Sequence, residues 1–371
     1  MPRSANIVVI GAGIVGCAVA YELVRRGAAV TIVDDRMIGM GATQASAGIL
    51  APFLESHGND PLLDLSIRSL DLYDDFVARV SAESDLSVSY SRCGSLSVAT
   101  EAEDIHELRA AAAALSRRGL SADVMDSRAV HREEPHLAEN VLAGLVIGTH
   151  GFVSARGLTR ALAEAARRRG ARLSEQHRVK HIAQQGADVV LETSRGALRA
   201  DAVVLAAGTW SGLVDVDDAP NRPPMKPVRG QLLQLTWPGA ELRRVLWSRQ
   251  VYMVPGDDGA VLVGATVEDV GFDEQATVAG VSGLLESACR LCPQARKAGF
   301  GEVRVGLRPG TSDDLPLIGA SRLLPRIVYA TGHYRSGVLL APITAHLIAD
   351  ALLENRSDPA AAILSPARFN L

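Results

Sequence analysis

The chain opens with two different spacings of apolar residues. The run from Ile7 to Ile10 is apolar and stops at Gly11, and the segment from Ile14 to Arg26 repeats apolar residues at helical spacing. Ala29 to Val33 is again apolar and rich in β-branched residues, which is typical of a buried strand. We therefore predict a strand, a helix and a second strand, which together form a βαβ unit.

Helical and strand patterns continue to alternate after this unit. Ser154 provides a cap for one predicted helix and Gly170 follows its end. The predicted helices cover Asp60 to Ala82, Ile105 to Arg118 and Ser154 to Arg169, and the predicted strands cover Ser95 to Ala99, Val141 to Ile147, Val189 to Glu192 and Ala202 to Leu205.

Prolines and glycines divide the next region into short apolar runs. Strand patterns cover Gln231 to Leu235, Val251 to Val254 and Ala260 to Val263, with a turn at Asp257-Asp258-Gly259. Short strands joined by tight turns indicate an antiparallel sheet rather than further βαβ units.

The end of the chain returns to the opening pattern, with a strand from Ile327 to Ala330, then Gly332 and a long helix from Gly337 to Leu353. The predicted fold class is therefore α/β. A discontinuous Rossmann-like nucleotide-binding domain would take residues 1–85, 145–215 and 305–371, and an interleaved antiparallel-sheet domain that binds the substrate would take residues 86–144 and 216–304.

The charge balance argues against a polyanionic partner. The 371 residues include 38 basic and 42 acidic ones, for a formal net charge of -4. Because these charges are spread along the chain, we expect a small-molecule ligand and no nucleic acid. No uninterrupted apolar run of about 18 residues occurs, so we expect no transmembrane segment.

Four cysteines, Cys17, Cys93, Cys289 and Cys292, are too few and too scattered for a disulfide framework. This usage favours a reducing cytoplasm. Cys289 and Cys292 form a CxxC pair, but no second Cys or His pair stands at zinc-binding spacing. We therefore expect ordinary thiols and no metal site.

The chemistry begins at Gly11, Gly13 and Gly16, which form a GxGxxG motif between the first strand and the first helix. Glycines at this spacing allow a tight turn, a close backbone approach to a pyrophosphate and close packing of helix on strand. Asp34 ends the second strand, where a carboxylate binds a ribose diol. The alternative, in which these are packing glycines and a surface aspartate, leaves the combined spacing unexplained.

The motif alone does not choose between FAD and NAD. The segment Gly41 to Leu50, directly after the acidic position, is rich in small residues and hydroxyls and would let the backbone approach a bulky planar cofactor. An NAD-dependent dehydrogenase has no role for it or for the late segment Ala330 to Arg335.

Five segments together resemble the D-amino-acid-oxidase superfamily of flavoproteins, most closely the glycine oxidases linked to thiamine thiazole synthesis. They are Val9 to Gly16 with Asp34, Ala42 to Pro52, Val203 to Ser211, Val251 to Thr266, and Gly306 to Pro342. The resemblance implies noncovalent FAD, since no cysteine follows Cys292 to attach it. The cofactor residues that it implies, beside the three glycines and Asp34, are Ile14, Val15, Asp35, Ala42, Thr43, Ser46, Ala47, Gly48, Ile49, Val179, Gly208, Gly332, His333, Tyr334, Arg335, Ser336, Gly337, Val338 and Leu339.

The same resemblance assigns Arg308 to the substrate carboxylate, Tyr252 to an assisting hydroxyl and Arg335 to a place near flavin and substrate. It implies oxidation of glycine, a small amine or a small D-amino acid by hydride transfer to the flavin, with dioxygen reduced to hydrogen peroxide. A D-amino-acid dehydrogenase that passes electrons to a quinone, a sarcosine or secondary-amine oxidase, and a noncatalytic flavin-binding protein stay open, as does a homo-oligomeric state.

Two positions depart from the family pattern. Arg304 stands where the family often has tryptophan, and Gly256 stands where it has an arginine. We expect a change in pocket shape or charge there, and the identity of the substrate is the inference that these departures weaken.

Overall fold

A six-stranded sheet forms around the predicted βαβ unit. β1 (Asn6–Ile10) leads through α1 (Ile14–Arg25) to the parallel strand β2 (Ala29–Val33). The sheet is completed by β9 (Arg172–Ser174), β13 (Ala202–Leu205) and β21 (Ile327–Thr331), all parallel, and by the antiparallel edge strand β20 (Leu317–Ala320). This is a computed structural model, and it describes residues 5–54, 61–256 and 259–371.

Alternation along β1 places the two faces of this sheet in different cores. Ile7 and Val9 belong to the core under the helices, whereas Val8 and Ile10 belong to the core on the opposite face. The helical layer contains α1, α6 (Ala155–Arg168) and α8 (Gly337–Glu354), and the opposite layer is a four-stranded sheet of β10 (Val179–Gln185), β11 (Asp188–Thr193), β12 (Gly196–Ala200) and β14 (Asp215–Val216).

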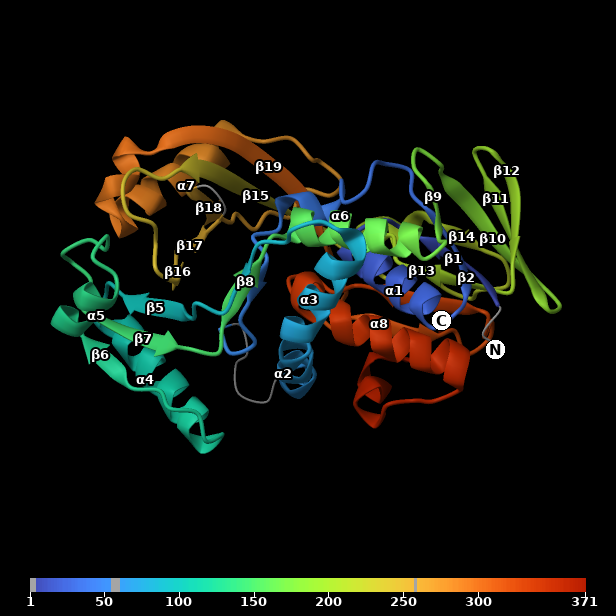
Figure 1. Cartoon of the computed structure of the whole chain (residues 1–371), viewed down its shortest axis with the longest axis horizontal. Coiled ribbons are helices and arrows are strands. Elements are labelled where there is room, and N and C mark those ends of the chain that lie inside the picture. Colours follow the sequence, from blue (N-terminus) through green and yellow to red (C-terminus); the bar gives the residue numbers. More distant parts are fainter. Residues whose placement is uncertain (1–4, 55–60, 257–258) are drawn as a thin grey trace.

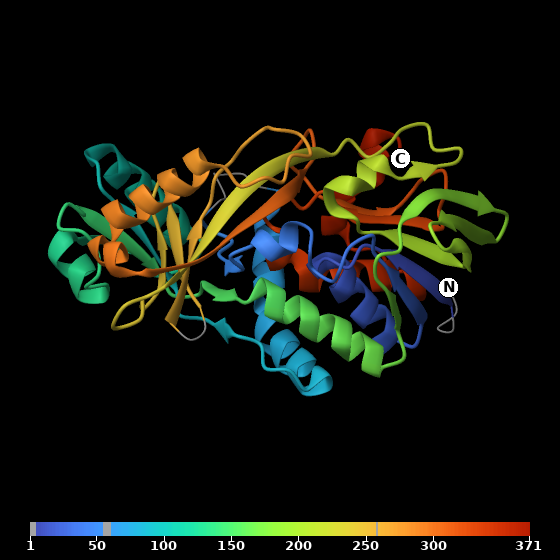
Figure 2. The ribbon, with the colours of Figure 1, turned by 90° about the horizontal axis from the view of Figure 1, so that it is seen from above.

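An eight-stranded, mostly antiparallel sheet forms the other lobe (Figure 1). Its strands, in order across the sheet, are β19 (Gly299–Gly310), β15 (Lys226–Thr236), β18 (Ala260–Gly264), β17 (Tyr252–Pro255), β16 (Val245–Trp247), β5 (Ser95–Ala99), β7 (Ala143–Ile147) and β6 (Val124–Asp126). Helix α7 (Val278–Leu291) packs against β15 and β18, and α4 (Ala102–Arg117) against β5 and β7. The long strands β15 and β19 run from this lobe to the middle of the molecule (Figure 2).

Smaller elements join the lobes. A three-stranded sheet of β3 (Ile49–Leu50), β8 (Gly151–Val153) and β4 (Tyr90–Ser91) lies between them, and α5 (Ser127–Glu133) follows β6. The α/β class with two kinds of sheet is confirmed. The division into an FAD-binding and a substrate-binding domain stays a proposal, and its boundaries at 144/145 and 304/305 fall inside β7 and β19 of the eight-stranded sheet.

One predicted helix is wrong as a single element. The structure has α2 (Leu63–Asp71) and α3 (Tyr73–Ser84), separated at Leu72, and the predicted start at Asp60 lies outside the described residues. Next to the break, the hydroxyls of Ser69 and Tyr73 donate to the carbonyls of Leu339 and Val338 at the start of α8. Because the last turn of α2 and the first turn of α3 are both hydrogen-bonded to the start of α8, this packing interrupts the helix although the sequence pattern is continuous. Of the predicted Asp257-Asp258-Gly259 turn, residues 257–258 also lie outside the described residues.

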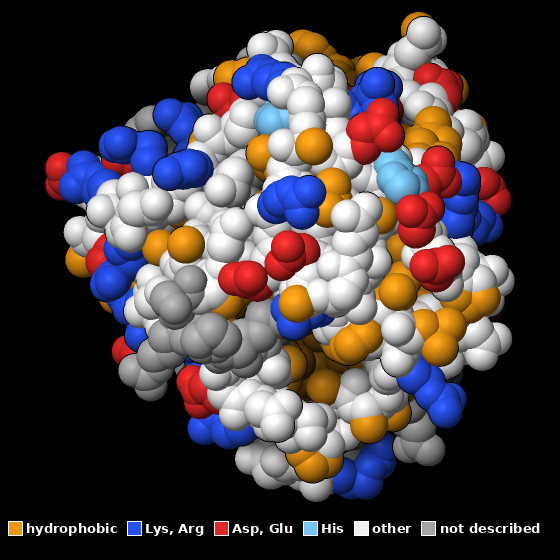
Figure 3. All heavy atoms as spheres, turned by 90° about the vertical axis from the view of Figure 1, so that its right-hand side faces the viewer, with side chains coloured by type: hydrophobic (Ala, Val, Ile, Leu, Met, Phe, Trp, Pro, Cys, Tyr) orange, Lys and Arg blue, Asp and Glu red, His pale blue; other side chains and the backbone are white. Residues whose placement is uncertain are grey.

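Helix α8 is, among the described residues, the one helix long and apolar enough to span a membrane. Within the fold, 72% of it is buried, and it packs against α1 and α2. It is therefore a core helix of this structure. On the molecular face shown in Figure 3, acidic and basic side chains are interspersed rather than gathered by sign.

The four cysteines all carry free thiols. Cys17 and Cys292 are buried, and Cys93 and Cys289 are half-buried. Burial raises the pKa of both Cys17 and Cys292, so these two thiols stay protonated and act as small apolar groups.

Candidate active site

A cavity of about 930 Å³ runs from the parallel sheet to the eight-stranded sheet. The residues at or just after the carboxyl ends of β1, β2, β13 and β21 line it, which is where ligands bind in open α/β sheets. It also contains most of the predicted site residues: Gly11, Gly13, Ile14, Val15, Asp34, Asp35, Ala42, Thr43, Ser46, Ala47, Gly48, Ile49, Val179, Gly208, Tyr252, Arg308, His333, Tyr334, Arg335, Ser336, Gly337, Val338 and Leu339.

The three motif glycines divide between packing and lining. Gly11 has φ +110°, and a Cβ there would lie 2.6 Å from the carbonyl carbon of Ala206. A Cβ at Gly16 would overlap the carbonyl oxygen of Gly11, so Gly16 lets α1 approach β1 and does not itself line the cavity. Gly13 lines the cavity, where a Cβ would meet only Thr43 Oγ1, at 3.4 Å.

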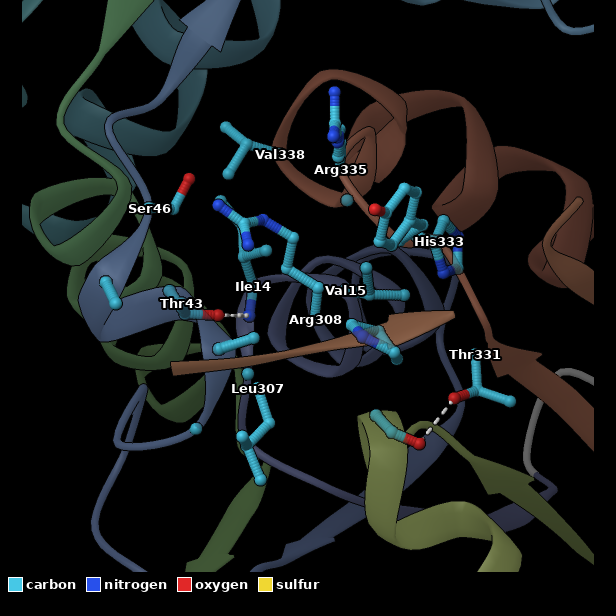
Figure 4. Close-up of a pocket in the computed structure, with 18 of the residues that line it drawn as sticks. Ile14, Val15, Thr43, Ser46, Leu307, Arg308, Thr331, His333, Arg335 and Val338 are labelled. Atoms are coloured by element: carbon cyan, nitrogen blue, oxygen red, sulfur yellow. Dashed lines mark hydrogen bonds between the residues drawn. The ribbon is translucent and has the colours of Figure 1, made fainter. Parts of the chain in front are cut away.

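The N-terminus of α1 opens onto the cavity. Gly13, at the N-cap, has no side chain to cap the helix, and of the first N–H groups that of Ile14 donates to Thr43 Oγ1 at 3.1 Å (Figure 4). Unsatisfied N–H groups and the positive end of the helix dipole favour an anion at this point. This end of the cavity is therefore suited to a pyrophosphate.

Asp34 is held in place by the backbone. Its Oδ2 accepts from the Ala12 N–H at 2.5 Å and its Oδ1 accepts from the Arg36 N–H at 2.7 Å. Burial raises the pKa of Asp34, although these two hydrogen bonds favour the carboxylate. The carboxylate thus stands fixed at the end of β2, where a ribose hydroxyl can reach it.

Asp35 and Val179 lie beside this carboxylate. Asp35 forms an ion pair with Arg178 at 2.6 Å, so its side chain has a protein partner as well as a place in the lining. Val179 begins β10, and His177, two residues earlier, forms side-chain hydrogen bonds with Ser174 and Thr193.

The small-residue segment forms the next wall. Gly48 has φ +70°, and a Cβ there would overlap the Val153 carbonyl oxygen, so only glycine fits. Its N–H donates to Ser46 Oγ at 3.2 Å, and its carbonyl accepts from the Val153 N–H at 2.9 Å. On the opposite side, Gly208 accepts from Thr331 Oγ1 at 2.9 Å.

The loop before α8 closes the far end of the cavity. Gly332 has φ +77° and faces Thr311 rather than the cavity. No side chain caps α8 at Ser336, and the first residues of the helix, Gly337 to Leu339, line the cavity. A second helix N-terminus without a side-chain cap therefore faces the cavity, where its positive end would favour negative charge on a ligand.

Tyr252 and Arg308 reach the cavity from the eight-stranded sheet. Tyr252 lies on β17 and stacks on Trp247, with ring centroids 5.4 Å apart. Arg308 lies on β19, is half-buried, and extends into the cavity in Figure 4. Among the lining residues, the carboxylates are Asp34, Asp35 and Asp215.

Arg335 and the two departures from the family pattern lie differently. Arg335 is exposed, and in Figure 4 its side chain points away from Arg308. Arg304 is outside the lining: its Nε donates to Glu302 at 2.7 Å, and a second nitrogen bonds to Gln234. Gly256 is also outside the lining, so neither departure changes the wall of this cavity.

Several lining residues were missed by the sequence analysis. Trp210 lies within one of the segments that carry the resemblance, and Arg36 stacks on its ring at 4.2 Å. Phe272 also lines the cavity, and its ring centroid lies 6.2 Å from that of Trp210. No periodic or motif signal marks Phe272, because it comes from a segment without helix or strand.

Two buried histidines should make the protein less stable in mild acid. Burial lowers the pKa of His333 to about 4, and burial with the nearby Arg92 lowers that of His150 to about 3. An unfolded chain binds these protons near pH 6.5, so below that value the free energy of unfolding should fall by up to about 1.4 kcal/mol per pH unit for each histidine. Urea unfolding from about pH 7 to about pH 5 measures this slope.

The matched variants are His333→Asn, which should reduce the slope, and His106→Asn at an exposed position of α4, which should not. Equal slopes in wild type and His333→Asn would contradict the assignment.

The family model described as FAD dependent oxidoreductase matches residues 6–351. The bifunctional protein ThiO/ThiG of Nostoc sp. is 37% identical over 361 residues, which cover 95% of this chain and 53% of that protein. The glycine oxidase of Geobacillus kaustophilus is 30% identical over 352 residues, which cover 94% of this chain and 93% of that enzyme. The chain spans about half the length of the bifunctional relatives.

Solved structures of oxidases have the same fold as this chain. The crystal structure of glycine oxidase from Geobacillus kaustophilus matches with a TM-score of 0.92 and 29% identity, over 98% of both chains. That of iminodiacetate oxidase from Chelativorans sp. BNC1 matches with a TM-score of 0.87 and 26% identity, over 97% of this chain and 98% of the other.

The cavity fits the cofactor of this family. It offers an uncapped helix start and Gly13 for a pyrophosphate, a fixed carboxylate at Asp34 for a ribose, and a second uncapped helix start at α8 beyond them. Its volume lies at the upper end of the usual range for ligand sites. The chain therefore belongs to the family of FAD-dependent oxidoreductases.

Proposed function

We propose that this chain oxidises glycine, or another small amine that carries a carboxylate, such as sarcosine or a small D-amino acid. The products would be a 2-oxo acid, ammonia or a primary amine, and hydrogen peroxide formed from dioxygen. The observation that carries this proposal is the position of Arg308, a cation in the part of the cavity that faces the eight-stranded sheet. The similarity to glycine oxidases supports it.

The residues of the chain would bind and orient the substrate. The Arg308 guanidinium would bind the carboxylate through paired N–H donors, and the Tyr252 hydroxyl would donate to the same group. FAD, when bound, supplies the hydride acceptor. Arg308 and Arg335 both line the cavity, and their positive charge favours an anionic substrate.

A peroxide assay tests the proposal. Purified, flavin-loaded protein should release peroxide with at least one member of a panel of glycine, sarcosine, D-alanine and other small amines. Bleaching of the flavin under anaerobic conditions with slow reoxidation in air would instead show a dehydrogenase. No bleaching with any member would refute amine oxidation.

A role in thiamine synthesis is part of the same proposal and is supported by the match to the ThiO/ThiG relatives. Expression in a bacterial strain that lacks ThiO should restore growth without thiamine. A cytoplasmic location and a homo-oligomer are also proposed, and size-exclusion chromatography with light scattering tests the second.

Replacing Glu274 should speed the loss of FAD. The segment between β18 and α7 covers the cavity with Val267 and Phe272, and Glu274 ties it to Arg36 through bonds of 2.9 and 2.6 Å. Because this ion pair is half-exposed, Glu274→Gln should raise the dissociation rate about 2- to 5-fold. Flavin fluorescence after dilution measures the rate.

The control is Glu286→Gln, which removes an exposed pair with Arg290 on α7. Equal dissociation rates in the two variants would show that the Arg36 pair does not retain the cofactor.

A further inference from the structure

Two glycines lie beneath the two side chains proposed to bind the substrate. β19, β15, β18 and β17 are neighbours in that order, so Arg308 and Tyr252 on the outer strands flank Gly230 and Gly264 on the inner ones. A Cβ at Gly230 would lie 2.5, 2.6 and 2.7 Å from Nη1, Nη2 and Cζ of Arg308. A Cβ at Gly264 would lie 2.5 Å from Cζ of Tyr252. Both side chains therefore lie flat on the sheet.

Backbone carbonyls hold one arm of the Arg308 guanidinium. Its Nη1 donates to the Thr266 carbonyl at 3.0 Å and, more weakly, to the Arg229 carbonyl at 3.4 Å. Within the described part of the chain, these are the hydrogen bonds of the Arg308 side chain. Nε and Nη2 are thus left for a ligand.

An ion pair beneath the sheet fixes these carbonyls. Arg229 and Glu268 pair through their backbones at 2.9 and 3.0 Å, and Arg229 Nη2 donates to Glu268 Oε2 at 2.5 Å. Glu268 Oε1 accepts from Thr266 Oγ1 at 2.5 Å and from Gln231 Nε2 at 2.8 Å. The Arg229 side chain is only 4% exposed and that of Glu268 25%, so the pair is largely buried, and Arg229 also pairs with Asp273 at 2.6 Å.

We propose that Gly230 and the Arg229–Glu268 pair are positioning residues that preset the Arg308 guanidinium for a planar carboxylate. Gly230 gives the guanidinium a flat surface, and the pair fixes the two carbonyls that orient it. An arginine that is already ordered loses less side-chain freedom when it binds its ligand, so the affinity for the carboxylate is higher. This inference rests on the proposed function, because it takes Arg308 as the substrate ligand.

Gly230→Ala tests the proposal. The atoms that the new Cβ would meet first belong to the end of a flexible side chain, so the fold can persist while the guanidinium moves. In the flavin-loaded protein, acetate titrated against the flavin absorbance spectrum should bind about 10- to 100-fold more weakly than in wild type, the loss expected for a displaced charged hydrogen bond. FAD content and the thermal unfolding temperature should not change.

Gly299→Ala is the matched control, since it adds a methyl group at a strand position whose nearest neighbour, Thr236 Cβ, would lie 3.4 Å away. Its acetate affinity should equal that of wild type. Glu268→Gln should raise KM for a carboxylate substrate with little change in kcat, and Glu268→Asp should restore part of the loss.

The outcomes separate this inference from the proposed function. Equal acetate affinity in wild type and Gly230→Ala, or a crystal structure of Gly230→Ala with the guanidinium unmoved, would overturn the positioning role. So would a wild-type protein that binds no acetate. Weaker acetate binding in Gly230→Ala, in a protein that oxidises no amine of the panel, would support the positioning role and refute only the proposed substrate.

Discussion

Arg308→Ala should lower kcat/KM for carboxylate-bearing amines by about 10²- to 10³-fold, because it removes the charged hydrogen bonds from Nε and Nη2 to the substrate. The loss should appear mainly in KM if the arginine binds substrate and transition state equally. An amine of similar size without a carboxylate should lose much less. Peroxide release under steady-state conditions measures both substrates.

The structure offers a matched control on the same strand. Arg304 lies four residues before Arg308 but outside the cavity, where it pairs with Glu302. Arg304→Ala should therefore keep kcat/KM within about 3-fold of wild type, because the partly buried ion pair that it removes does not reach the cavity. Arg308→Lys keeps the charge but loses the planar fork, and should lie between the two.

If Arg304→Ala and Arg308→Ala lowered kcat/KM equally, the position of Arg308 in the cavity wall would not explain its loss of activity. If Arg308→Ala kept full activity toward glycine, the carboxylate would have to bind elsewhere in the cavity. The exposed Arg335 would then be the residue to replace next.

The contrast between Arg304 and Arg308 shows where sequence reasoning reaches its limit. Both positions have the same parity on one strand, so alternation alone assigns them to one face. Strand β19 is 12 residues long and runs from one lobe to the centre, so only its later part meets the cavity. The length and course of a strand depend on its partners, which a local pattern does not contain.

Local patterns were sufficient where local chemistry decides the structure. The turn at Gly11 and the helix cap at Ser154, which accepts from the Gly157 N–H, were predictable because backbone conformation and capping depend on a few adjacent residues. The break at Leu72 was not, since Ser69 and Tyr73 bind carbonyls of α8, far along the chain. Phe272 likewise covers the cavity in a segment that is anchored by long-range ion pairs, Asp273 with Arg229 and Glu274 with Arg36.

Within six residues, the glycine motif contains features that the sequence predicts and features that only the structure shows. Its presence predicted a dinucleotide site, but the motif alone does not say which glycine serves packing and which serves the ligand. The structure distinguishes these two roles. Gly16 packs against protein backbone outside the lining, whereas Gly13 faces the cavity, and Gly11 lines the cavity while its Cβ position meets the Ala206 backbone. Stability and cofactor binding should therefore respond to different members of the motif.

Gly16→Ala should reduce the free energy of unfolding by about 3 kcal/mol, because its Cβ would overlap the carbonyl oxygen of Gly11 and push α1 off the sheet. Gly13→Ala should change it by less than about 1 kcal/mol, since its Cβ would meet only Thr43 Oγ1 at ordinary contact distance. Its expected effect is on the ligand: a methyl group between the backbone and the pyrophosphate should weaken FAD binding by about tenfold or more. Urea unfolding of the apoprotein and fluorescence titration with FAD measure the two effects separately.

The two variants should lose different properties: Gly16→Ala should lose stability, and Gly13→Ala should lose FAD affinity. Gly16→Ala should lose stability in the apoprotein, before any cofactor is present, and excess FAD should recover part of it through binding. Gly13→Ala apoprotein should unfold like wild type and gain less from the same FAD concentration. If Gly13→Ala apoprotein were as unstable as Gly16→Ala, the turn itself would require glycine at position 13, and the assignment of that residue to the pyrophosphate would fail.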